Sequence, residues 1–146
     1  MMRVSTRARY GLRALGALAA AYGRGPLSVR AIAETQQLSP KYLERLFVTL
    51  KRAGLVLAVR GAGGGYVLAQ EPGETRLLHV FEVLEGPPEP VECLQPEATC
   101  PHENACATRD VWHEVSQAVS GVLANHTLAD LVGTPHPCPE KGRCQP

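Results

Sequence analysis

Three closely spaced cysteines are the strongest indication of chemistry in this sequence. Cys93, Cys100 and Cys106 lie in the stretch CLQPEATCPHENAC, with six and then five residues between them. Thiolates bind zinc and iron–sulfur clusters alike. Structural zinc sites generally hold cysteines roughly two to four residues apart, and these gaps are longer. The spacing therefore predicts a metal or cluster site, and it leaves zinc, an iron–sulfur cluster and a thiol–disulfide switch open.

The compartment of the chain decides how such cysteines are interpreted. No apolar run approaches the length of about 18 residues that a membrane helix needs, and the N-terminal residues lack the pattern of a secretory signal. We therefore expect a cytoplasmic protein with no membrane partner. In a reducing compartment, clustered cysteines are more often metal-binding or redox groups than structural disulfides. Two further cysteines, Cys138 and Cys144, are open to ligation, to a reversible disulfide or to no role.

The charge of the chain is divided between two halves. Residues 1–70, the basic half, hold eleven of the fifteen Lys and Arg residues and only Glu34 and Glu44 as acids, a balance of +9. Residues 71–146, the acidic half, hold four basic and twelve acidic residues, a balance of −8. A basic region of this size predicts a polyanionic partner, which the acidic half cannot face. An ordinary solvated basic face is the alternative.

The elements of the basic half follow a recognisable order. Apolar residues at three- and four-residue steps predict helices over about 5–22, 28–37 and 39–52, the third with Leu43, Leu46, Phe47 and Leu50 on its inner face. Ser28 and Ser39 are expected helix caps, and Leu38 a buried turn residue. Strands at 55–59 and 66–68 flank a glycine-rich turn. Together these elements predict a mainly α fold with a small β-hairpin wing, a winged helix-turn-helix.

The acidic half is expected to carry a sensor and a helix. Periodicity predicts a helix over 75–84, the cysteine loop at 93–106, a long helix over 108–125 and a capped turn at 127–132. A valine and alanine stripe on the long helix suits a homodimer, or packing on its own domain. We expect a DNA-binding region at 1–72, a sensor and dimerisation region at 73–132 and a cysteine-containing tail at 133–146.

Several segments resemble a known family. The stretches MRVSTRARYGLRAL, LSPKYLERLFVTLKRAGLV and VRGAGGGYVLA are similar to the Rrf-two family of bacterial winged-helix transcriptional regulators. The cysteine loop, CATRDVWHEVSQAVSGVLAN and TLADLV resemble its iron–sulfur branch, the IscR/NsrR-like proteins. The resemblance runs from Met2 to about Val132. It implies a homodimer, joined through the helix 108–125, that binds double-stranded promoter DNA and acts as a repressor and not as an enzyme.

The resemblance also implies which residues meet DNA. The third helix would enter the major groove, where Ser39, Lys41, Tyr42 and Glu44 would reach bases. Arg60, before the glycine tip of the wing, would enter a minor groove. The residues expected at phosphates are Arg7, Arg9, Arg45, Lys51 and Arg52. Two alternatives stay open: Glu44 pairs with Lys41 or Arg45 on the helix surface, and Tyr42 packs against the wing.

For the cysteines, the resemblance implies an iron–sulfur cluster, [2Fe–2S] in preference to [4Fe–4S], held by Cys93, Cys100 and Cys106. The positions where family members place a fourth ligand hold Arg109 and Arg9 here, and neither can ligate. The candidates for that ligand are Asp110, His113, His102 and Glu103, with a tail cysteine, an exogenous thiol or water as further options.

The implied function is operator binding that is switched by the cluster. The signal would be cluster status, nitric oxide, iron or redox stress, and the sequence leaves open which form binds DNA. A zinc or thiol–disulfide regulator of the same fold is an alternative. A small iron–sulfur electron-transfer protein would not need the basic half, and an enzyme using Cys106 and His113 lacks a visible oxyanion site. Regulators of cysteine metabolism in this family need no cysteine loop.

Overall fold

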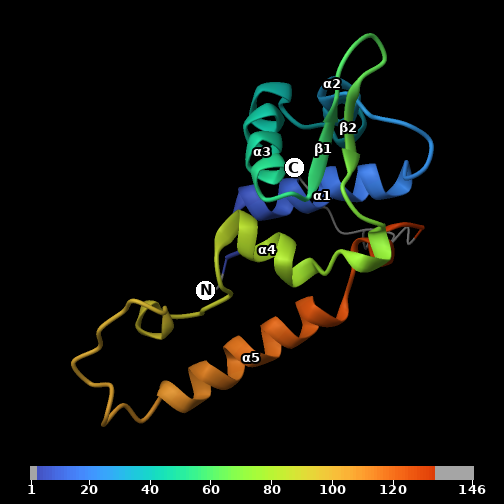
Figure 1. The fold of residues 1–146 in the computed structure, drawn as a ribbon. Helices are drawn as coiled ribbons and strands as arrows, with labels where there is room; N and C mark the ends of the chain where they lie inside the picture. Colours follow the sequence, from blue (N-terminus) through green and yellow to red (C-terminus); the bar gives the residue numbers. More distant parts are fainter. Residues whose placement is uncertain (1–2, 134–146) are drawn as a thin grey trace, which may run out of the picture.

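The basic half folds as three helices followed by a hairpin. In the computed structural model, which describes residues 3–133, the elements are α1 (Thr6–Ala20), α2 (Val29–Gln36), α3 (Pro40–Arg52), β1 (Val56–Val59) and β2 (Gly65–Leu68). The hairpin stands beside α3 and extends past it (Figure 1). The predicted winged helix-turn-helix is confirmed, with each strand shifted by one residue at its start.

Serine caps decide where the three helices begin. Each helix follows a serine whose side chain accepts a hydrogen bond from a backbone N–H in the first turn, at 3.1–3.4 Å, and the serines are Ser5, Ser28 and Ser39. Such caps satisfy donors that have no partner inside the helix. Between α2 and α3, Gln37 adopts a left-handed conformation with φ 54° and Leu38 is buried. The tight turn that the sequence predicted is therefore present.

The hairpin is held against the helices by an aromatic contact and a bridge. Strands β1 and β2 are antiparallel, with Val56 opposite Leu68 and Val59 opposite Gly65. The ring of Tyr66 packs on Phe47 of α3, with centroids 4.5 Å apart, and its backbone exchanges hydrogen bonds with Leu27. A Cβ atom at Gly65 would lie 2.1 Å from the carbonyl oxygen of Leu27, so only glycine fits this close approach.

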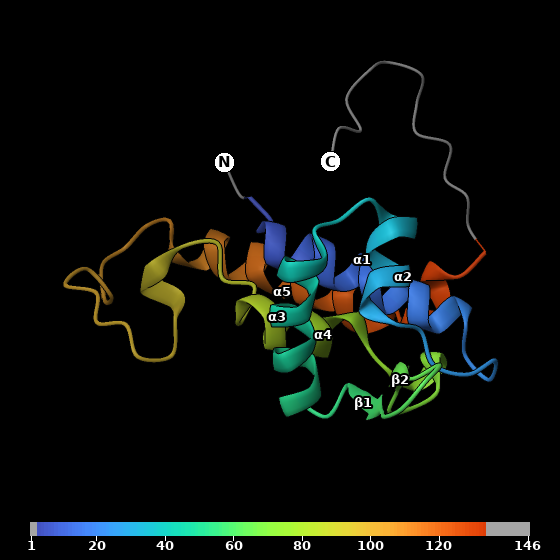
Figure 2. The same cartoon turned by 90° about the horizontal axis from the view of Figure 1, so that it is seen from above.

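The acidic half adds two helices beneath this unit. Its elements are η1 (Pro72–Glu74), α4 (Leu77–Glu85), η2 (Glu92–Leu94), α5 (Arg109–Asn125) and η3 (Leu128–Leu131). Helix α4 packs on α1, and α5 packs on α4 (Figures 1 and 2). The predicted start of α4 at residue 75 was wrong, because Thr75 and Arg76 are extended and Arg76 bridges to Thr127. The predicted capped turn is η3, with Thr127 and Asp130 forming a capping box.

Helix α5 is the least buried of the long elements. Within the described chain Ser116 is its only buried residue, whereas Val111 and Val122 of the predicted stripe are 56% and 60% exposed. The helix packs on α4, and its Leu123 packs against the core. Neither α5 nor any other described helix is both long and apolar enough to cross a bilayer.

Candidate DNA-binding face and cysteine loop

The first turns of α3 present side chains to solvent. Lys41, Glu44 and Arg45 are exposed, and Glu44 has no ion-pair partner within the described chain. The alternative that Glu44 pairs with Lys41 or Arg45 is therefore not realised. An acidic group kept free on a basic surface can accept a hydrogen bond from the amino group of a base.

Tyr42 packs against α1. Its ring meets Tyr10 edge-on, with centroids 5.8 Å apart and planes at 88°. The guanidinium carbons of Arg9 and Arg13 each lie 5.8 Å from the centroid of the Tyr10 ring. Within the described chain the aromatic partner of Tyr42 is thus Tyr10 of α1, whereas Tyr66 of the wing packs on Phe47 of α3. The aromatic pair fixes the first turn of α3 against α1.

A small basic hollow lies between α1 and α3. It has a volume of about 280 Å³ and is lined by Arg7, Tyr42, Arg45, Leu46 and Thr49. The Arg7 guanidinium donates to Thr49 Oγ1 at 3.4 Å, which orients it toward α3. The structure thus brings together Arg7 and Arg45, two of the residues predicted to meet phosphates. Two arginines beside a hollow that is also lined by hydroxyl groups can together bind the oxygens of one phosphate group.

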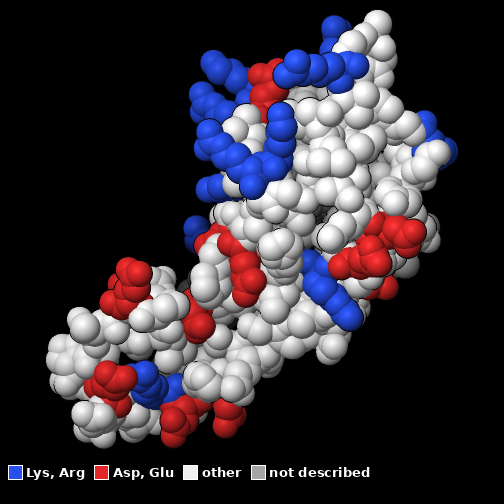
Figure 3. All heavy atoms as spheres, viewed as in Figure 1, with Lys and Arg blue, Asp and Glu red and all other residues white. Residues whose placement is uncertain are grey.

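The wing places its arginine at the edge of the molecule. Arg60 is exposed and follows β1 directly, and Gly61 and Gly63 in the turn have φ angles of 100° and 74°. These left-handed angles favour glycine and allow the tip to reverse within a few residues. The space-filling view shows Lys and Arg side chains gathered over the upper part of the molecule, where α3 and the wing lie, and acidic side chains over the lower part (Figure 3).

The cysteine loop extends away from this basic face. It forms the yellow to orange segment between α4 and α5, at the far edge of the molecule in both ribbon views (Figures 1 and 2). The three thiols are free and half-buried. Within residues 3–133 no three His, Cys, Asp or Glu side chains converge as a metal site would require. Asp110, His113, His102 and Glu103, the candidate fourth ligands, are exposed.

Local contacts shape the end of the loop. The Cys106 sulfur lies 3.5 Å from Thr108 Oγ1, and this hydrogen bond, with backbone N–H groups of Thr108 and Arg109, lowers the pKa of the Cys106 thiol. Arg109, at the position where the resemblance implies a ligand, pairs instead with Glu103 at 3.1 Å. The donor set has the chemistry of a cluster site, since thiolates are the usual ligands, but the loop must close further to gather the three sulfurs.

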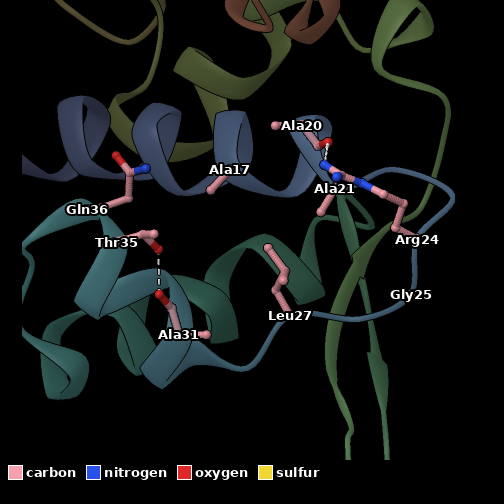
Figure 4. A pocket seen from close by; sticks show the side chains of 9 residues that line it. All are labelled: Ala17, Ala20, Ala21, Arg24, Gly25, Leu27, Ala31, Thr35 and Gln36. Atoms are coloured by element: carbon pink, nitrogen blue, oxygen red, sulfur yellow. Dashed lines mark hydrogen bonds between the residues drawn. The ribbon is translucent and has the colours of Figure 1, made fainter.

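A larger hollow lies elsewhere, between α1 and α2, and has a volume of about 530 Å³. Alanine side chains form much of its wall, with Arg24 at one end and Gln36 at the other (Figure 4). Arg24 donates to the carbonyl oxygen of Ala20, and Thr35 donates to that of Ala31. None of the predicted site residues lines this hollow.

Comparison with known proteins identifies the family to which this chain belongs. Residues 4–134 match the model of Rrf2, described as an iron-dependent transcriptional regulator. The chain belongs to the Rrf2 family. A curated Rrf2-type relative, the transcriptional regulator CymR of Bacillus subtilis, is 45% identical over 130 residues, which cover 89% of each chain. The regulator IscR of Serratia proteamaculans is 36% identical over 131 residues, which cover 90% of this chain and 79% of IscR.

Solved Rrf2-family structures agree with the observed fold. CymR of B. subtilis, described as the global cysteine regulator of that organism, superposes with a TM-score of 0.76 at 44% identity, over 90% of this chain and 96% of CymR. The IscR of T. potens superposes with a TM-score of 0.73 at 41% identity, over 89% of this chain and 85% of IscR. These relatives are transcriptional regulators and not enzymes, and the chain is a transcriptional regulator that binds DNA.

Two contributors to the candidate DNA-binding face of this Rrf2-family chain were not predicted. Tyr10 supports Tyr42, and Thr49 receives Arg7. The signal for Tyr10 was available, because it lies three residues from both Arg7 and Arg13, a spacing that places side chains on one side of a helix. No local signal indicated Thr49, whose partner is 42 residues away. The tail cysteines Cys138 and Cys144 lie outside the described residues.

Proposed function

We propose that the chain is a repressor that binds operator DNA through the first turns of α3 and the wing, under the control of the cysteine loop. The observation that carries the DNA-binding part is the exposed basic face, with Lys41, Arg45 and Arg60 directed outward and Arg7 and Arg45 lining one hollow. Arg7, Arg9, Arg45 and Lys51 contact phosphates, and Ser39, Lys41, Tyr42 and Glu44 face base edges. Arg60 enters a minor groove.

We further propose that the regulator acts as a homodimer joined through α5. A helix of 17 residues with a single buried one leaves most of its surface to solvent in one chain. Its exposed apolar side chains include Val111, Trp112 and Val122. Large exposed apolar surface of this kind is typical of a protein–protein interface. Pairing of two copies would set the two recognition helices at a fixed separation, as half-sites of an operator require.

The regulatory part of the proposal places an iron–sulfur cluster on Cys93, Cys100 and Cys106. When bound, the cluster supplies a redox-sensitive and chemically labile centre. The chain supplies three thiol ligands on one loop whose described hydrogen bonds are all local, so the loop can close without breaking a described hydrogen bond to the rest of the fold. The remaining ligand would come from Asp110 or His113 at the start of α5, or from His102 in the loop. Arg109 is engaged with Glu103 and only orients this end of the loop.

The test is a direct one. The chain is purified without oxygen, its visible spectrum is recorded, and iron and sulfide are measured per chain. A duplex selected with the protein from a randomised pool, called the selected operator below, is then titrated with loaded and metal-free protein. We expect stoichiometric iron and sulfide and different affinities for the two forms. A colourless protein with zinc, or without metal, would defeat the cluster while leaving DNA binding to be judged by the titration.

A second candidate is a regulator of the same fold that responds through its thiols without a cluster. The observation that favours it is the higher identity to CymR, 45%, than to the IscR of Serratia proteamaculans, 36%. The three free and half-buried cysteines are open to reversible oxidation. In that case the selected operator would bind reduced and oxidised protein with different affinities in the absence of iron, and serine at all three positions would remove the difference.

A further inference from the structure

A carboxylate ties the end of α4 to the beginning of α1. The backbone N–H of Ser5 donates to Glu85 Oε1 at 3.0 Å and to Oε2 at 3.2 Å, and the Ser5 hydroxyl donates to Oε2 at 3.0 Å. The same hydroxyl oxygen accepts from the N–H of Ala8 at 3.2 Å and so caps α1. The two residues are 80 positions apart, so this set of hydrogen bonds between Ser5 and Glu85, called the joint below, depends on the tertiary fold.

The presence of a carboxylate at position 85 is explained by its contact with the beginning of α1 and not by its position in α4. It is the last residue of α4, where the partial negative charge of the helix end disfavours a carboxylate. At the first turn of α1 the partial charge is positive and favours it. The two helices also approach closely here, because a Cβ atom on Gly11 would lie 2.3 Å from Leu84 Cδ1.

The other side of the first turn of α1 touches the recognition helix. Arg7 donates to Thr49 of α3 at 3.4 Å. Tyr10 of α1 packs against Tyr42 of α3 with the ring centroids 5.8 Å apart. A shift of the first turn of α1 would therefore move Arg7 out of the hollow that it forms with Arg45.

The segment that leads from α4 to the cysteine loop begins immediately after Glu85. The N–H of Gly86 donates to the carbonyl oxygen of Glu82 at 2.9 Å, which closes the last turn of α4. Gly86 has a φ of 91°, and the chain leaves the helix at this residue. A displacement of the loop would act first on this final turn, because terminal turns open most easily, and Glu85 would move with it.

We infer that Glu85 is a positioning residue that holds the first turn of α1, and with it Arg7, in the arrangement that binds DNA, and that movement of the cysteine loop loosens this hold. This inference rests on the proposed function, which supplies the DNA and the moving loop. Glu85 itself lies outside the DNA-binding face and acts through Ser5.

A double-mutant cycle on the metal-free protein tests the first half of the inference. Glu85→Ala should weaken binding to the selected operator roughly fivefold in a fluorescence anisotropy titration. In the Arg7→Ala background the same change should have less than about a twofold effect, because its route to the DNA is already lost. The matched control is Glu82→Ala, which removes the same charge from an exposed position one turn earlier on α4 and should leave affinity unchanged.

Three results would overturn it: no effect of Glu85→Ala, no effect of Arg7→Ala, or equal effects of Glu85→Ala and Glu82→Ala. Glu85→Gln, which keeps the size and one acceptor, guards against simple loss of folding. If that variant melts at the wild-type temperature, its backbone amides at residues 6–9 should still exchange hydrogen faster than those of the wild type. Equal exchange would also contradict the joint.

The second half is tested by comparing protein reconstituted with iron and sulfide against metal-free protein. If wild type responds to loading, Glu85→Ala should lose most of that response while Glu82→Ala keeps it. An unchanged response in Glu85→Ala would overturn the inferred link. If wild type itself shows no response, the proposed cluster switch fails and loosening by the loop fails with it, whereas the cycle on metal-free protein still judges the joint between Glu85 and Arg7.

Discussion

The basic half and the acidic half of this chain differ in the contacts that each half makes internally. Six of the eight largest fully buried side chains belong to the basic half, where three helices and the wing enclose them. In the acidic half, the described hydrogen bonds of the cysteine loop are local. Ser116 is the only buried residue of α5 within the described chain. The hydrophobic core of the described chain lies mostly in the basic half and is completed by residues of α4 and by Leu128. The acidic half leaves its three thiols half-buried and the apolar side chains of Val111 and Val122 exposed, which agrees with the proposed partner chain and ligand.

The largest effect is expected when the core of the basic half is emptied. Phe47→Ala should lower the free energy of unfolding by about 3–5 kcal/mol, because the ring is fully buried against Tyr66. Urea unfolding followed by circular dichroism measures the loss. Val48→Ala, on the exposed side of the same helix, should change it by less than about 0.5 kcal/mol. Similar losses at both positions would mean that the basic half is not organised around this core.

The acidic half should be sensitive to a change on its exposed stripe instead. Val122→Asp should weaken self-association by at least about 2 kcal/mol, because a carboxylate replaces an apolar side chain that is 60% exposed in the single chain. Sedimentation equilibrium measures this, and unfolding of the separated chain should change little. Gln117→Asp, on the opposite side of α5, serves as the control. A chain that is monomeric before any substitution would remove the basis of this prediction.

A smaller effect is expected at the wing. Arg60→Ala should weaken binding to the selected operator by roughly 1–2 kcal/mol, or about five- to thirtyfold, with no change in stability, since Arg60 is exposed. Gel-shift titrations at several salt concentrations measure this. Arg60→Lys keeps the charge and should retain the salt dependence, but it should lose part of the preference for a narrow minor groove. Unchanged affinity of Arg60→Ala at every salt concentration would exclude the wing arginine from the interface.

The smallest effect concerns the capped turn that closes the acidic half. The Thr127 N–H donates to Asp130 at 2.7 Å, and this hydrogen bond lowers the pKa of the Asp130 carboxyl. Because the pKa is lower in the folded chain, the carboxylate stabilises the fold at pH values above its unfolded pKa. That contribution is lost as the pH falls through the folded value.

Asp130→Asn should therefore lower the unfolding midpoint slightly at neutral pH and not at acidic pH. Thermal unfolding at a series of pH values checks this sign, with Glu97→Gln in the exposed loop as a control that should show no such trend. A difference that grows toward acidic pH would contradict the assigned role of the capping box.

Most of the winged helix was predictable because its signals are local. Ser28 and Ser39 cap their helices as expected, and Leu43, Leu46, Phe47 and Leu50 are buried on one face of α3. The start of α4 was misplaced because Arg76 pairs with Thr127, a bridge that helix periodicity cannot reveal. The cysteine spacing indicated a loop with ligand chemistry, but it did not indicate that the thiols stand apart from a common centre in the described conformation.

The helices, the caps at Ser28 and Ser39, the wing and the division of charge follow from the amino-acid sequence alone, because each depends on composition or on residues within a turn or two of one another. Packing across the whole chain decided that Glu44 stands free, that Tyr42 packs on Tyr10, and that Val111 and Val122 of α5 stay exposed. It also decided that Glu85 reaches Ser5 across 80 positions. Such contacts depend on how whole helices pack. Local sequence patterns do not predict which distant side chains that packing brings together.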